Sequence, residues 1–100
     1  QKMTDRTVFI PNKSNHDFSQ AEEFGRLVYV TTGVVSRLNV AQIEREVSAV
    51  MAEAKPDDYI MIASLPIIVS VMVGTMAARF SRINLLLYRH GRYVERRVEF

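Results

Sequence analysis

Short apolar runs alternate along the chain with polar turn residues, and this pattern predicts five strands. The runs are rich in β-branched and aromatic residues, and the last of them alternates apolar with charged positions. Pro11 is expected to end the first strand, and His90-Gly91 to form the turn between the last two. The expected strands are residues 7–10, 27–31, 59–63, 83–88 and 93–100.

Two helices are expected between the first three strands. Ser19 and Glu22 have the spacing of a capping box, which predicts a short helix that Gly25 closes. Asn39 is expected to cap a longer helix, with Gln42 at the capping-box position. This longer helix is amphipathic and is expected to end before Pro56. Its apolar face is formed by Ile43, Val47, Val50, Met51 and Ala54.

A third helix, from Ile67 to Phe80, is apolar nearly all round. Ser64 is a candidate cap, and Pro66 suits its first turn. At 1.5 Å per residue the helix is about 21 Å long, which is too short to cross a hydrocarbon core of about 30 Å. We therefore expect either a helix buried between the sheet and a subunit or a helix that forms one side of a homo-oligomer contact. The residues small enough for close approach are Ser70, Gly74, Ala77 and Ala78.

The alternation of strands and helices predicts an α/β fold. We expect a small Rossmann-like domain of two or three layers, with about five strands, a mainly parallel sheet and a C-terminal antiparallel hairpin. The 100 residues form one domain, 1–100, because the chain is too short for a second core. Gln1 and Lys2 precede a plausible start at Met3, and we interpret them as residues left by a tag.

The amino-acid composition limits the kinds of metal and cofactor site that the chain can form. The chain has no cysteine and only two histidines, so a disulfide framework and a thiolate metal site are excluded and a structural zinc site is not expected. No carboxylate cluster suits Mg²⁺, and we expect neither a metal nor a cofactor. No signal peptide follows Met3, and the cysteine-free composition is compatible with the reducing cytoplasm.

Charge is unevenly distributed, although the net charge is only +2. Residues 79–100 carry six arginines and two glutamates, whereas residues 37–58 are acidic on balance. The basic end is suited to nucleic acid or another anion, or to the acidic region of a neighbouring subunit. The third interpretation is a solvated hairpin without a partner.

In open parallel sheets, ligands bind outside the carboxyl ends of the strands, near the point where strand order reverses. If the first four strands are parallel, the loops after them meet along one edge. Cationic groups there would attract a phosphate, hydroxyl groups would donate hydrogen bonds, and an amide with an imidazole would recognise a base or sugar. The candidate ligand-binding residues are Lys13, Asn15, His16, Thr32, Ser64 and Arg89.

Each of these residues also has a purely structural interpretation. Lys13 and Asn15 suit an ordinary turn, Thr32 a strand end, and Ser64 a helix cap. Asp17, next to His16, has the simpler role of capping the short helix. No phosphate-loop or dinucleotide-binding glycine motif occurs in the chain.

Three functions follow from these patterns. The first is a non-catalytic binding protein for a nucleotide or another phosphorylated ligand. The second is a metal-independent phosphodiesterase or nuclease, with His16 as the general acid/base and Lys13 stabilising the developing charge. The third is a structural protein that forms homo-oligomers through the helix from Ile67 to Phe80.

Two stretches, NKSNHDFSQAEEFGRLVYVTTG and DYIMIASLPIIVSVMVGTMAARFSRINLLLYRHGRYVERRV, cover most of the chain. In these two stretches, the chain resembles a group of small uncharacterised proteins of phage and bacterial genomes. The resemblance implies a viral or mobile-element origin and a place of action in the bacterial cytoplasm. It implies no catalytic residue.

Overall fold

The structure, a computed structural model, describes residues 5–100 and has an α/β fold. Its five-stranded sheet has the order β2-β1-β3-β4-β5. β1 to β4 are parallel and β5 pairs antiparallel with β4, so the predicted parallel sheet with a C-terminal hairpin is confirmed. The strands are β1 (Thr7–Lys13), β2 (Arg26–Thr32), β3 (Tyr59–Met61), β4 (Arg82–Arg89) and β5 (Arg92–Glu99).

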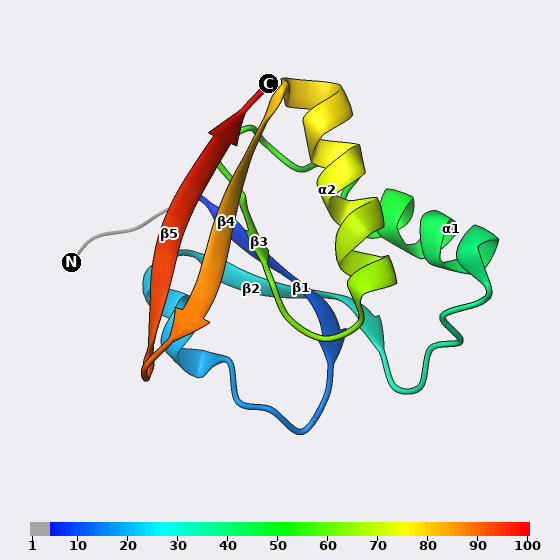
Figure 1. The fold of residues 1–100 in the computed structure, drawn as a ribbon, viewed down its shortest axis with the longest axis horizontal. Helices are drawn as coiled ribbons and strands as arrows, with labels where there is room; N and C mark the ends of the chain where they lie inside the picture. Colours follow the sequence, from blue (N-terminus) through cyan, green and yellow to red (C-terminus); the bar gives the residue numbers. More distant parts are fainter. Residues whose placement is uncertain (1–4) are drawn as a thin grey trace.

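Helices cover the two faces of the sheet unequally (Figure 1). The helices α1 (Val40–Val50) and α2 (Pro66–Phe80) lie together on one face and enclose the larger core cluster. The short 3-10 helix η1 (Ser19–Glu23) lies on the other face, over a smaller cluster around Phe18. Within residues 5–100, no helix has both the length and the apolar character needed to cross a membrane.

The amphipathic prediction for α1 is confirmed. Ile43, Val47 and Met51 are fully buried, and the side chain of Asn39 accepts a hydrogen bond from the backbone N–H of Gln42 at 3.2 Å. Arg79 of α2 donates hydrogen bonds to the carbonyls of residues 51, 52 and 54, at 2.7, 3.1 and 3.4 Å. The guanidinium therefore satisfies carbonyl groups just beyond the end of α1 and joins the two helices.

α2 buries Ile68, Met72 and Met76, which recur every fourth residue on the side facing the sheet. Pro66 stands in the first turn, as predicted. The predicted cap at Ser64 is wrong. Leu65 occupies the N-cap position without a side-chain hydrogen bond, and Ser64 lies outside the helix in a left-handed conformation with a φ of 64°.

Two further predictions about the first crossover are corrected. β1 continues through Pro11 to Lys13, because beyond Phe9 it has registered partners only in β2, and proline is tolerated where one side of a strand is unpaired. The capping box at Ser19 does not form. Instead the carboxylate of Asp17 accepts a hydrogen bond from the backbone N–H of Ser19, the first residue of η1, at 2.9 Å, although Phe18 and not Asp17 occupies the N-cap position.

β3 is shorter than predicted, since it ends at Met61 and not at Ala63. One more backbone hydrogen bond, from Ile62 N–H to the carbonyl of Leu86 at 3.0 Å, follows the strand before the chain turns at Ser64. The neighbouring strands β1 and β4 extend further in the same direction. The end of β3 is therefore a notch between two longer strands.

Asp58 fixes the opposite end of this central region. Its side chain is 1% exposed and accepts hydrogen bonds from the backbone N–H groups of Thr7, at 2.9 Å, and Lys55, at 2.7 Å. One carboxylate thus ties the start of β1 to the turn that leads into β3. These hydrogen bonds fix the position of β3 along β1.

The replacement Asp58→Asn is expected to lower the free energy of unfolding by about 2–3 kcal/mol, because the amide NH₂ faces a backbone donor and leaves it unsatisfied. Asp57→Asn is the matched control. Asp57 is exposed and pairs with Arg82, and it is expected to cost less than about 1 kcal/mol. Urea denaturation of both variants measures the difference, and equal losses would contradict the role given to Asp58.

Candidate functional site

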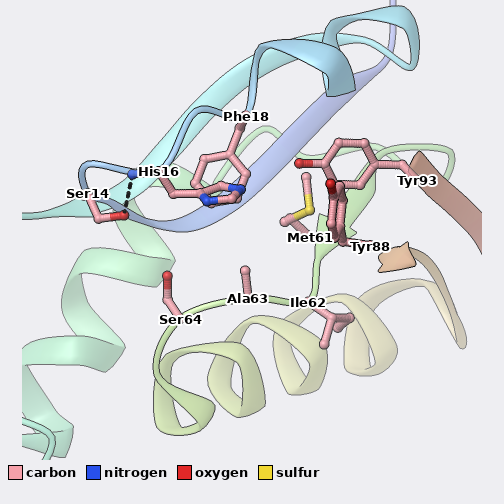
Figure 2. Close-up of a pocket in the computed structure, with 9 residues that line it drawn as sticks. All are labelled: Ser14, His16, Phe18, Met61, Ile62, Ala63, Ser64, Tyr88 and Tyr93. Atoms are coloured by element: carbon pink, nitrogen blue, oxygen red, sulfur yellow. Dashed lines mark hydrogen bonds between the residues drawn. The ribbon is translucent and has the colours of Figure 1, made fainter. Parts of the chain in front are cut away.

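A pocket of about 360 Å³ lies over the notch at the end of β3. Three parts of the chain form it: the loop after β1, the end of β3 with the turn into α2, and the β4–β5 hairpin (Figure 2). The volume is at the lower end of the range for small-molecule sites. The lining residues are Ser14, His16, Phe18, Met61, Ile62, Ala63, Ser64, Tyr88 and Tyr93.

Aromatic rings form much of the pocket. The rings of His16 and Phe18 meet edge to face, with centroids 4.6 Å apart, and those of Tyr88 and Tyr93 do the same at 5.3 Å. His16 and Tyr88 are 6.5 Å apart between centroids, across the pocket. Figure 2 shows the hydroxyl of Tyr93 pointing toward the side occupied by His16 and Phe18. The imidazole of His16 and the tyrosine hydroxyls are therefore polar groups in a largely apolar pocket.

Local backbone structure places the first pair of rings. The hydroxyl of Ser14 accepts a hydrogen bond from the backbone N–H of His16 at 3.3 Å, which turns the loop back toward the sheet. Asp17 then accepts a hydrogen bond from the backbone N–H of Ser19, where η1 begins, and this hydrogen bond lowers the pKa of the Asp17 carboxyl. Phe18 is 4% exposed and anchors this loop in the smaller core cluster.

A tight hairpin places the second pair. His90 and Gly91 both have positive φ, 52° and 86°, which is the requirement of a type I′ two-residue turn. The register that follows sets Tyr88 directly opposite Tyr93. Adjacent strand residues point to opposite faces, so both tyrosine rings lie on the pocket side of the sheet and Arg89 points away from it.

The structure brings two of the six predicted ligand residues into this pocket. His16 and Ser64 line it. Lys13, at the end of β1, holds its ammonium group 5.6 Å from the ring centroid of Tyr29. Asn15 is exposed in the loop between two lining residues, while Thr32 is paired with Lys13 in the register and does not line the pocket.

Sequence reasoning did not choose Phe18, Tyr88 or Tyr93 as ligand residues. A signal existed for the two tyrosines, because a two-residue turn at His90-Gly91 fixes them as a cross-strand pair. Nothing comparable identified Phe18, which comes from a loop and reaches the pocket through tertiary packing. Nor could the sequence reveal the short β3 that leaves room for them.

Two tyrosine hydroxyls resist ionisation. Burial raises the pKa of Tyr93, and the nearby Tyr88, Asp17 and Tyr29 raise it further. Burial also raises the pKa of Tyr59, at the start of β3 and outside the pocket lining, whose hydroxyl donates a hydrogen bond to Glu95 at 2.5 Å. At neutral pH both groups are therefore hydrogen-bond donors and not anions. In the part of the chain that the structure describes, no cluster of potential metal ligands is present.

An ultraviolet pH titration tests these assignments. Tyr59→Phe and Tyr93→Phe are each expected to remove a component that ionises above pH 10, the ordinary tyrosine value. Because the unfolded chain loses these protons first, both tyrosines stabilise the fold below about pH 10, and this contribution is lost as pH rises through the folded pKa values. Each single variant keeps the late component of the other tyrosine, so a late component of undiminished amplitude in either variant would contradict the burial of the hydroxyl removed there.

Comparison with known proteins assigns the chain to a family. A family model described as phage Pam3 gp32-like protein matches residues 6–100, nearly the whole chain. This match confirms the resemblance to small phage proteins. No curated protein and no solved structure matches the chain. The chain therefore belongs to the phage Pam3 gp32-like protein family.

Proposed function

We propose that the protein is a non-catalytic binding protein that holds a nucleotide, or another phosphorylated ligand with an aromatic ring, in the pocket over β3. The observation that carries this proposal is the convergence of His16, Tyr88 and Tyr93 on one pocket of about 360 Å³. A planar base offers an apolar face for the rings and polar edges for the imidazole and the hydroxyls.

The position in the sheet supports the same proposal. β1 pairs with β2 on one side and with β3 on the other, so the strand order reverses between β1 and β3. Ligands of Rossmann-like sheets bind at such a reversal, outside the carboxyl ends of the strands. We therefore also propose that the fold is Rossmann-like. Membership of a phage family favours the cytoplasm of the host bacterium as the place of action.

The residues around the ring site have separate roles in the proposal. Ser64 supplies a hydroxyl to the pocket lining, and Asn15 supplies an exposed amide from the loop between Ser14 and His16. Lys13, directly before Ser14, is the cation assigned to the phosphate. Thr32 and Arg89 contribute no lining, and the proposal gives them no contact with the ring.

The enzymatic alternative has weaker support. A catalytic histidine is normally oriented by a hydrogen bond to a third group. In residues 5–100, no hydrogen bond joins the imidazole of His16 to a carboxylate, and one carboxylate oxygen of Asp17 accepts the backbone N–H of Ser19. We therefore favour binding over hydrolysis.

Tyr88→Ala is expected to weaken nucleotide binding about tenfold, since stacking on an aromatic side chain contributes about 1–3 kcal/mol per base. Tyr88 is 56% exposed, so the fold should tolerate the change. Isothermal titration calorimetry with the four ribonucleoside monophosphates measures the affinities. Phe100→Ala is the control, because Phe100 is an exposed aromatic residue outside the pocket.

Two results would contradict the proposal. One is an absence of binding for all four nucleotides at millimolar concentration. The other is equal affinity in the wild type and Tyr88→Ala.

Homo-oligomer formation through α2 is a second candidate function. Pro66, Ser70, Gly74 and Ala78 recur every fourth residue on the exposed side of the helix. A Cβ atom at Gly74 would meet no other atom within 4 Å. A second helix could therefore approach closely along this row.

Gly74→Glu is expected to dissociate such an oligomer, because it places a charge in the contact while leaving the subunit itself uncrowded. Gly74→Ala is the matched control and should retain the assembly. Light scattering coupled to size-exclusion chromatography measures the mass of each variant. A wild-type monomer, or a Gly74→Glu variant of unchanged mass, would exclude α2 as the contact.

A further inference from the structure

A second hollow lies at the other end of the sheet, away from the ring pocket. It has a volume of about 470 Å³ and is lined by Asp5, Arg6, Arg26 and Lys55. These residues stand at the amino ends of β1 and β2 and in the turn before β3. We call it the amino-end hollow. Three of its four lining side chains are cationic.

Close backbone contact fixes the strand starts from which the two arginine side chains extend. The backbone N–H of Arg26 donates to the carbonyl of Arg6 at 3.0 Å, and Thr7 is paired with Arg26 in the register. Gly25 permits this approach, because a Cβ atom there would lie 2.5 Å from the same carbonyl oxygen. The register places the side chain of Arg26 on the face of Thr7 and that of the neighbouring Arg6 on the opposite face, and both reach the hollow because it lies at the end of the sheet.

Buried groups contact the side chains of Arg6 and Lys55 in the hollow. The guanidinium of Arg6 donates to the hydroxyl of Tyr59 at 2.8 Å. The backbone of Lys55 is held by Asp58, and its ammonium lies 3.6 Å from the same carboxylate. The side chain of Lys55 is 51% exposed, so its charge also faces solvent.

The cationic lining gives the hollow a positive potential that attracts anions, although Asp58 offsets part of the charge of Lys55. Arginine binds phosphate oxygens in a planar, two-pronged geometry, and lysine adds a point charge. Asp5 is the only carboxylate in the described lining, so the cations outnumber it. We infer that the amino-end hollow is a binding site for a phosphate group, separate from the ring pocket.

Such a phosphate is supplied either by a free ion or by the backbone of a nucleic acid. Two probes distinguish these sources: inorganic phosphate, followed by calorimetry, and a fluorescent 15-nucleotide single-stranded DNA, followed by anisotropy at several salt concentrations. Binding of inorganic phosphate identifies a site for one isolated group. Binding of the DNA alone identifies a contact with a phosphodiester backbone. Either result supports the site when the variants below respond as expected.

The double variant Arg26→Gln/Lys55→Gln is expected to weaken binding of the responding probe at least tenfold. For DNA, the slope of log affinity against log salt should fall by about 1.4, which is about 0.7 for each lost contact. The control is Arg37→Gln/Arg92→Gln, which removes the same charge from exposed positions outside the hollow. It should leave affinity within about threefold.

Two outcomes would overturn the inference. One is that neither probe binds at low salt. The other is that both double variants weaken binding equally, which would mean that the total charge of the protein matters and the hollow does not. Neither outcome bears on the ring pocket, because the substituted residues do not line it.

Discussion

β3 is three residues long, and it lies between β1 with seven residues and β4 with eight. Because all three strands are parallel, the longer neighbours pass the point where β3 ends. The chain then turns at Ser64, whose positive φ directs it into α2. A longer β3 would fill the space where the aromatic side chains now meet. The early end of one central strand therefore creates the pocket.

The core explains how this short strand persists. β3 is buried on both faces, with Ile60 in the larger cluster and Tyr59 and Met61 in the smaller one. Asp58, just before the strand, aligns it with β1 through buried hydrogen bonds. Burial and this carboxylate compensate for the few backbone hydrogen bonds that three residues can make. Side-chain burial and the Asp58 hydrogen bonds thus stabilise β3 together with its backbone hydrogen bonds to the neighbouring strands.

The sequence predicted the strands and their parallel pairing, because helices long enough for crossovers separate them, but it did not predict the order of the strands in the sheet. Local signals failed where tertiary pairing decided the outcome. β1 continues through Pro11 because its registered pairing with β3 ends at Phe9. Leu65, and not Ser64 as expected, occupies the N-cap position of α2. For the site, carboxyl-end placement predicted His16 and Ser64, but the contribution of Phe18 depended on packing that no spacing reveals.

The central claim is that the pocket over β3 binds a nucleotide. Chemical-shift mapping by ¹H–¹⁵N NMR during a nucleotide titration tests it most directly, because each described backbone amide reports its own position. The account predicts shifts concentrated at residues 14–18, 61–64 and 88–93, the segments that form the pocket. Saturable shifts elsewhere without any at these segments, or no shifts at millimolar nucleotide, would contradict it.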